Sequence, residues 1–269
     1  MQPWSAIGQN WRSSSWMGFL AGCQGCWPHR RGEDSSGSAR DGQMDSPESS
    51  QAYDPGCRQC PRLAGFLDAV LAANPGYFCK PVPPFGDPNP RMLIVGLAPG
   101  LHGANRTGRP FTGDACSNLL YGTLYRLGLS SAPRSLSTED GLALKGCRIT
   151  NAVKCLPPAN KPTGPEGRAC GQFLHAELLS TAPRVIVCLG SVSHDAVLRS
   201  LALSSSGRRA SEFRFAHGAR HLIEQATGSV IVFDSYHPSR YNVNTGRLTQ
   251  AMFEAALGEA ARLAGLSHV

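Results

Sequence analysis

GLAPGLHGANRTGRPFTGD (residues 96–114) and SYHPSRYNVNTGRLT (residues 235–249) are the two stretches that decide how this chain folds. Each directly follows a short apolar run, residues 93–95 and 230–233, that is typical of a buried strand, and each leads into a helix-like segment. In an open α/β sheet, the loops at the carboxyl ends of parallel strands converge on one crevice, where ligands bind. The two stretches therefore predict an active site.

The apolar patterns along the rest of the chain predict an alternating order of strands and helices. Strands are expected at four places: residues 91–96, 147–153, 184–189 and 229–233. Helices are expected between and around them, at residues 60–73, 115–127, 164–179, 191–201 and 248–264. Short apolar strands that alternate with helices favour an α/β fold, with a parallel sheet covered on both faces.

The composition bounds the class of protein. The chain has 269 residues, of which 41% are hydrophobic and 17% charged, so most of it can be globular. It has no run of about 18 apolar residues, so no transmembrane helix and no membrane partner are expected. Polar residues interrupt the apolar start, which is therefore a poor signal peptide. We expect a cytoplasmic protein.

Residues 1–52 differ from the rest of the chain. They contain all four Trp, followed by a Ser-, Gly- and acid-rich segment at residues 31–51 with almost no apolar side chains. Such a segment cannot bury a core, so we expect a disordered extension, with the folded domain at residues 53–269. Met44 lies just before this domain, which raises the hypothesis that the extension is a start-site artefact.

The folded part is basic. The chain carries a formal net charge of +7, and residues 1–50 contribute −1 from four Arg and five acids. The remainder carries +8, from 22 Lys and Arg against 14 acids. A basic globular part favours a polyanionic partner such as nucleic acid, although a merely basic protein without such a partner has the same balance.

Four of the ten cysteines form a candidate metal set: Cys57, Cys60, Cys155 and Cys170. The first two have C-x2-C spacing, and a loop rich in Pro and Gly separates the last two. Four thiolates suit zinc or an iron–sulfur cluster, and spacing does not separate the two; unligated thiols are the third reading. No role is assigned to Cys23 and Cys26. Four further cysteines are expected to be small core residues: Cys79, Cys116, Cys147 and Cys188.

The first stretch offers several groups to a ligand. Glycines such as Gly96 and Gly100 allow backbone N–H groups to approach it closely. Arg109 can contact phosphate, and Phe111 can stack on a flat ring. Asp114 lies where the next helix begins, so it is either an ordinary N-cap or a functional carboxylate, and the two roles are compatible.

The ends of two other strands carry further candidates. Asn151 has both a donor and an acceptor, so it can pair with the amide edge of a base, or it is a turn residue. His237 can donate to an oxygen that becomes negative, or it is satisfied by nearby backbone. Arg240 and Arg247 can reach phosphates.

Together these residues resemble the uracil-DNA glycosylase superfamily, and within it the type-5 family. The resemblance rests on residues 96–114, on NAVKC at residues 151–155 and on HPSRYNVNTGRLT at residues 237–249. It covers roughly residues 56–263, with three long motifs in the right order. It implies a three-layer α/β/α sandwich with a four-stranded parallel sheet. It also implies a structural [4Fe-4S] cluster held by the four candidate cysteines.

The resemblance carries over to single residues. The related type-4 family has a carboxylate in its GEAPG motif, where this chain has GLAPG. Its Ala98 is small and apolar, which fits a permissive base pocket. Activation of water would therefore fall to Asp114. Asn151 would read the base, Phe111 would stack on it and His237 would stabilise the leaving group.

The implied function is DNA repair: a monomeric glycosylase that flips uracil, and other deaminated or etheno-damaged bases, out of double-stranded DNA and excises them by hydrolysis. Two alternatives stand beside it. One is a metal-stabilised module that binds nucleic acid without chemistry. The other is a redox protein, which lacks support because no G-x-G-x-x-G fingerprint follows a strand.

Overall fold

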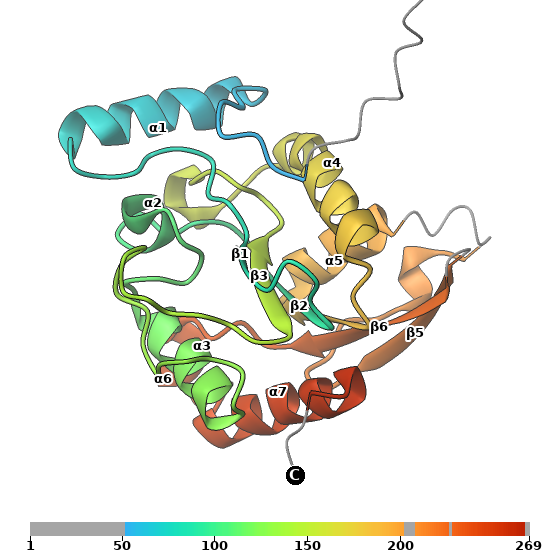
Figure 1. Cartoon of the computed structure of the whole chain (residues 1–269). Coiled ribbons are helices and arrows are strands. Elements are labelled where there is room, and N and C mark those ends of the chain that lie inside the picture. Colours follow the sequence, from blue (N-terminus) through green and yellow to red (C-terminus); the bar gives the residue numbers. More distant parts are fainter. Residues whose placement is uncertain (1–51, 202–207, 226–227, 267–269) are drawn as a thin grey trace, which may run out of the picture. The chain divides into compact units, whose positions relative to one another are not determined.

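A computed structural model describes residues 52–201, 208–225 and 228–266 of the chain (Figure 1). The expected extension at residues 1–52 lies outside the described residues except for its last residue, and so do Cys23 and Cys26. The division of the chain at residue 53 therefore stays a prediction.

Four parallel strands form the centre of the sheet, as predicted. They lie in the order β3 (Cys147–Asn151), β2 (Met92–Gly96), β4 (Val185–Leu189) and β6 (Gly228–Ser235). Every residue of β2 and β4 is buried, which explains their uninterrupted apolar sequences, because both faces of a parallel sheet are covered. Strand β3 lies on one side of β2, and the next strand, β4, lies on the other side. The order of strands therefore reverses at β2.

The sheet has six strands rather than four. The two additional strands lie at its edges and are antiparallel: β1 (Phe85–Gly86) pairs with β3, and β5 (Arg220–Gln225) pairs with β6. The two-residue β1 lies in a Pro-rich segment, which hides it from any pattern. Strand β5 has one buried residue, Ile223, and exposes Leu222, so it does not read as a core strand.

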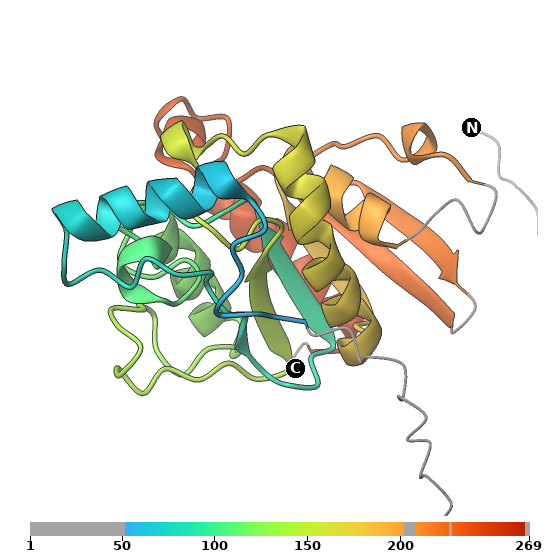
Figure 2. The same cartoon turned by 90° about the horizontal axis from the view of Figure 1, so that it is seen from above.

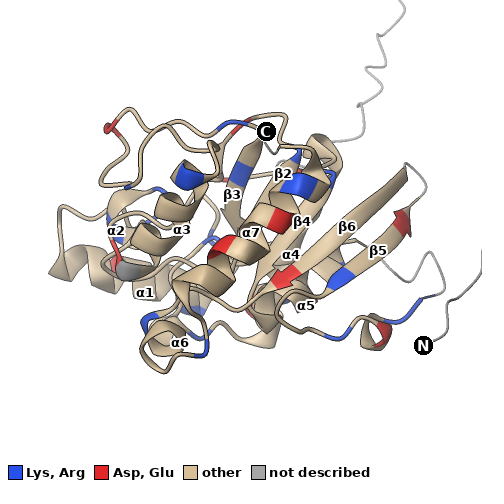
Figure 3. Ribbon diagram, turned by 90° about the horizontal axis from the view of Figure 1, so that it is seen from below, with Lys and Arg blue, Asp and Glu red and all other residues tan. Residues whose placement is uncertain are grey.

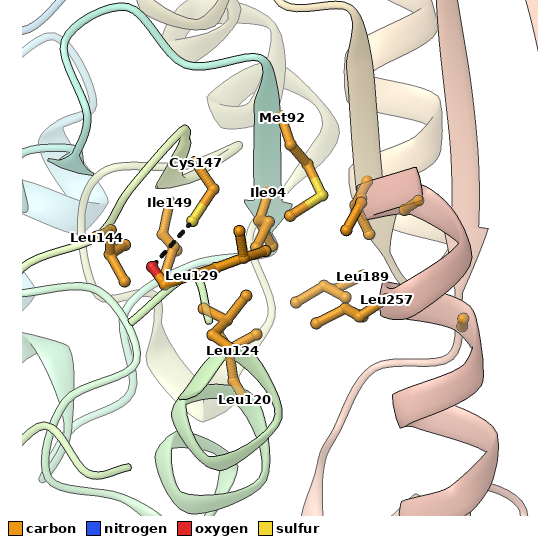
Figure 4. Close-up of a cluster of buried hydrophobic side chains, with 14 of the residues drawn as sticks. Met92, Ile94, Leu120, Leu124, Leu129, Leu144, Cys147, Ile149, Leu189 and Leu257 are labelled. Atoms are coloured by element: carbon orange, nitrogen blue, oxygen red, sulfur yellow. Dashed lines mark hydrogen bonds between the residues drawn. The ribbon is translucent and has the colours of Figure 1, made fainter. Parts of the chain in front are cut away.

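Helices cover both faces of the sheet. Helices α3 (Ala115–Arg126) and α7 (Gln250–Ala264) pack on one face, and α4 (Gly164–Thr181) and α5 (Ser191–Ser200) pack on the other. The three-layer α/β/α prediction is thus confirmed. Figure 4 shows the core between α3, α7 and the sheet, which includes buried side chains from all three: Ile94, Leu120, Leu124, Ile149, Leu189 and Leu257.

The predicted helix at residues 60–73 is α1 (Pro61–Ala73), which lies beside α4 (Figure 2, cyan and yellow). Its residue Arg62 forms a two-bond ion pair with Glu166 of α4, at 2.7 Å for each bond. No helix in the described part of the chain is long and apolar enough to cross a membrane.

Four short helical segments were not predicted. Two follow the carboxyl ends of strands: α2 (Ala104–Thr107) in the loop after β2, and α6 (Arg240–Asn244) in the loop after β6. The other two are 3-10 turns, Pro158–Asn160 and Ala210–Glu212. Segments of three to five residues are too short to show a helical period.

Candidate active site

A cavity of about 570 Å³ opens at the carboxyl ends of β2, β3 and β6. Its volume is in the range of sites for small organic ligands. Most of the predicted site residues line it: Ala98, Gly100, Phe111, Asp114, Asn151, His237 and Arg240. The structure adds lining residues to which sequence analysis gave no role in the site: Leu97, Leu101, His102, Ala104, Cys116, Asn160 and Ser239. Most of these lie between the predicted residues in the same loops, so position along the chain was the available signal.

Gly96, Phe111 and Asn151 form a tight contact at the end of β2. A Cβ atom at Gly96 would collide with Asn151 Oδ1 and would lie 2.7 Å from the Phe111 ring. Glycine is therefore required here by close approach of its neighbours. Phe111 is 7% exposed and Asn151 is 4% exposed, so this contact forms a buried floor. An aromatic ring beside a side-chain amide can stack on a flat heterocycle and bond its edge.

His237 lies next to this floor. Its ring centroid is 5.8 Å from that of Phe111, with 30° between the ring planes. The backbone carbonyl of His237 accepts bonds from Asn242 Nδ2 and from the Ser239 N–H, both at 2.8 Å, which fix the loop after β6. Burial lowers the pKa of His237 to about 4, because the charged ring loses its hydration. The imidazole is neutral at pH 7 and can donate one N–H.

Asp114 combines both roles that the sequence allowed. Its Oδ1 accepts from the Ser117 N–H at 2.9 Å, which makes it the N-cap of α3. A Cβ atom at Gly103 would collide with Oδ2, so glycine makes room for this oxygen. Burial raises the pKa of Asp114, while the Ser117 and Cys116 N–H groups and the Arg240 charge oppose that rise. Among the described lining residues, Asp114 alone carries a carboxylate.

Two of the three arginines predicted to contact DNA lie on the surface near the cavity. Arg240 is exposed at its rim. Arg247 is also exposed, and its guanidinium lies 4.6 Å from the centre of the Tyr236 ring. Figure 3 draws Lys and Arg in blue, and blue segments of the ribbon lie beside α6.

The prediction that Arg109 contacts phosphate is wrong. The side chain is 5% exposed and forms an ion pair with Asp140 at 2.7 Å. It also donates to Ser135 Oγ at 3.0 Å and to the Thr138 carbonyl at 2.9 Å, and it lies over the Phe85 ring. With its charge and donors used inside the protein, Arg109 is not placed to contact phosphate. It ties the loop of residues 135–140 to the end of the first motif.

The four candidate metal cysteines line one small cavity, which adjoins α1 and α4. Cys60 is the N-cap residue of α1, and Cys170 lies on α4 and accepts from the Lys154 N–H at 3.2 Å. Four thiols around one cavity suit one shared centre, either zinc or an iron–sulfur cluster.

A second group could also hold a metal ion: ligand atoms of Cys188, His194 and Asp234 lie within 4.8 Å of one another. Hydrogen bonds already account for this group. His194 bonds Asp234 through Nδ1 at 2.8 Å and the Phe213 carbonyl through Nε2 at 2.9 Å, and His221 Nε2 bonds the other oxygen of Asp234 at 3.2 Å. The arrangement ties α5 and β5 to β6.

The remaining cysteines divide in a way that was only partly predicted. Cys79, Cys147 and Cys188 are buried, as expected of small core residues. Cys116 is half-buried and packs against the edge of the core, and it also lines the cavity beside Asp114, which was not predicted. Burial and the Asp114 charge raise the pKa of Cys116 to about 12, so the thiol is protonated at pH 7.

Comparison with known proteins agrees with this geometry. The model of the uracil DNA glycosylase superfamily matches residues 83–261. The chain belongs to that superfamily. It is 47% identical to a type-5 uracil-DNA glycosylase of Thermus thermophilus, over 78% of this chain and 94% of the relative. A type-5 enzyme of Pyrobaculum aerophilum is 44% identical over 78% of this chain and 89% of the relative.

A type-4 uracil-DNA glycosylase of Sulfurisphaera tokodaii is 30% identical, over 64% of this chain and 71% of the relative. The motifs of this chain resemble the type-5 family, and the two type-5 enzymes, which match the chain over most of their own length, confirm that resemblance.

The buried contacts of Arg109 predict a structural role. Replacing Arg109 with Leu leaves the Asp140 carboxylate without its cation, so the free energy of unfolding should fall by about 3–5 kcal/mol. The matched change Arg240→Leu removes an exposed arginine and should alter it by less than about 0.5 kcal/mol. Urea denaturation of the three proteins measures both values. Equal stability of the two variants would contradict the structural role.

Proposed function

We propose that this protein is a DNA repair glycosylase that hydrolyses the bond between uracil and deoxyribose in double-stranded DNA and leaves an abasic site. The observation that carries the proposal is one cavity lined by an aromatic ring, an amide, a neutral imidazole and a single carboxylate. The similar proteins, which are type-5 uracil-DNA glycosylases, support the choice of uracil. We extend the proposal to other deaminated and etheno-damaged bases, because Ala98, which lines the cavity, has a small and apolar side chain.

The first step brings the base to the floor of the cavity. The enzyme turns the damaged nucleotide out of the duplex, at a cost of a few kcal/mol for unstacking and unpairing. Phe111 stacks on the base, and Asn151 bonds its Watson–Crick edge. The buried position of both side chains excludes water from that edge, which strengthens each hydrogen bond.

The second step breaks the bond between C1′ of the sugar and N1 of uracil. The bonding electrons leave with the base, which becomes an anion, and the sugar becomes an oxocarbenium-like cation. His237 donates its N–H to an oxygen of the departing base. A neutral imidazole suits this task, because it is present in full at pH 7 when its pKa is about 4.

Asp114 acts on the sugar side. Burial raises the pKa of Asp114, whereas the Ser117 and Cys116 N–H groups and the Arg240 charge favour its ionised form. One carboxylate oxygen caps α3, and the other stabilises the sugar cation and orients the attacking water. The water oxygen joins C1′, and its proton ends on the base, which completes the hydrolysis.

We further propose that Arg240 and Arg247 contact the phosphates of double-stranded DNA and that the protein acts as a monomer. The positive charge of residues 51–269 supports a polyanionic partner. A site in the cytoplasm, where thiols stay reduced, suits a protein whose eight described cysteines are all free.

We also propose that the four candidate cysteines hold one [4Fe-4S] cluster. Cys57 and Cys60 would ligate it from the start of α1, Cys155 from the loop after β3, and Cys170 from α4. Its contribution would be structural, since iron–thiolate bonds would join α1 to the loop that follows the base-reading Asn151. The position of the four thiols around one cavity supports a shared centre.

The proposed chemistry predicts the effect of two substitutions. Asp114→Ala and His237→Ala should each lower the single-turnover rate of uracil excision by at least about 10-fold, because each removes stabilisation of one charge in the transition state. Excision is measured on a labelled U·G duplex by alkali-induced strand scission. Asp68→Ala, on an exposed residue of α1, is the control and should keep the wild-type rate. A normal rate for Asp114→Ala would remove its role.

The close contact at Gly96 predicts a second loss. In Gly96→Ala, the added methyl group displaces Asn151 or Phe111, so the excision rate should fall roughly 10- to 100-fold through misplacement of the base. The control is Gly171→Ala, where an added Cβ meets no atom within 4 Å. If both variants excise uracil at the wild-type rate, the floor of the cavity does not hold the base in the proposed way.

The cluster proposal predicts the metal content. Protein purified without oxygen should contain about four iron atoms per chain, with a brown absorbance. Cys170→Ser should lose most of this iron, whereas Cys188→Ala, a buried thiol elsewhere in the sheet, should keep it. Iron and zinc are measured together by mass spectrometry. One zinc per chain and no iron would refute the cluster.

A further inference from the structure

His102 is a residue of the cavity rim to which the proposed chemistry gives no role. It follows the first motif's GLAPGL, lines the cavity and is exposed. A hydrogen bond of 2.8 Å joins its Nδ1 to the Tyr77 hydroxyl. The two rings meet edge to face, with centroids 6.0 Å apart and planes at 86°. An exposed histidine would not keep one orientation without such a partner.

Tyr77 is itself firmly held. Its backbone N–H donates to the Asn74 carbonyl at 2.9 Å. The next two residues bond the backbone of α2: Phe78 N–H to Arg106 O, and Cys79 N–H to Asn105 O, both at 3.1 Å. The Tyr77 ring packs, together with Leu101, against a buried cluster formed by Leu67, Val70, Cys79 and Leu156. The segment after α1 therefore presents the hydroxyl from a fixed place.

The bond to Tyr77 leaves the other ring nitrogen of His102, Nε2, outside the contact. Either ring nitrogen can carry the proton of a neutral imidazole, so the Tyr77 hydroxyl either donates to Nδ1 or accepts from it. When the hydroxyl donates to Nδ1, the proton lies on Nε2, and Nε2–H is a donor with no role in the Tyr77 contact.

The depth of His102 indicates which part of the DNA it meets. Phe111 and Asn151 form the buried floor, whereas His102 and Arg240 are exposed at the rim. When a base enters the cavity, its phosphates stay outside, at the level of the rim. The exposed Arg106 adds positive charge nearby, since its Nε donates to the His102 carbonyl at 2.8 Å.

We propose that His102, oriented by Tyr77, is a positioning residue that donates from Nε2 to a phosphate oxygen next to the flipped nucleotide. The contact fixes the sugar of that nucleotide over Asp114 and does not act on the bond that breaks. This assignment rests on the proposed glycosylase function. Phosphate contacts of this kind set the register of a protein on DNA and carry no sequence information.

The test couples the side chain to a single phosphate. Duplexes carry a non-cleavable 2′-fluoro-deoxyuridine opposite guanine, with one uncharged methylphosphonate at each flanking linkage in turn. On the natural backbone, His102→Ala should raise the Kd by at least about 10-fold, the size of a hydrogen bond to a charged group. At one linkage, the methylphosphonate should weaken the wild type by a similar factor and leave His102→Ala unaffected.

Tyr77→Phe tests the orientation by removing one oxygen. It should raise the Kd by a smaller factor than His102→Ala, and only on duplexes that keep the coupled phosphate charged. Tyr125→Phe, an exposed tyrosine of α3 outside the cavity lining, is the matched control and should bind as the wild type does.

Two results would overturn the assignment. One is an equal loss of affinity by His102→Ala on every backbone, which would show no coupling to a phosphate. The other is an unchanged Kd with a lower excision rate at saturating DNA, which would give His102 a part in the chemistry. Either result with an active wild type leaves the glycosylase proposal intact. A wild type that does not excise uracil from the matching cleavable duplex would refute that proposal instead.

Discussion

The contact at the end of β2 is the constraint on which the rest of the site depends. Gly96 has no side chain, so Phe111 and Asn151 can meet directly above its backbone. Phe111 reaches this place with a positive φ of 51°, a conformation that costs free energy for a bulky residue. The surrounding loop must supply that free energy. Its anchor is Arg109, whose contacts hold the chain two residues before Phe111.

The need for this anchor explains why Arg109, which is suited to contact phosphate, instead has a structural role. Sequence alone shows that Arg109 lies in a loop near the site, and arginine in such a loop commonly contacts DNA. The partner that captures it, Asp140, comes 31 residues later in a segment without a strand or helix. Pairing over that separation depends on the tertiary fold, and no local pattern reveals it. The cavity-lining position of Cys116, which also packs against the core, was missed for a similar reason, because no local pattern distinguishes the two environments.

Much of the architecture could be predicted, because the central strands and long helices have strong local signals. Strands β2 and β4 are uninterrupted apolar runs, and Gly128, just after the C-cap of α3, has the positive φ of 73° that is typical of a helix end. The edge strands could not be predicted in this way. Strand β5 is defined by its pairing with β6, and one buried residue in six gives no period to read.

Asp114 shows why the sequence left two readings open and why they need not exclude each other. Its Oδ1 accepts from the Ser117 N–H, and Oδ2 lies in the space that Gly103 leaves. The cap fixes the side chain, and the free N–H groups at the start of α3 favour its ionised form, against the effect of burial. A carboxylate that must stabilise a sugar cation benefits from both effects. The N–H groups at the helix N-terminus favour the charged form, and partial burial leaves that charge poorly screened, so its attraction to a nearby cation is stronger than in water.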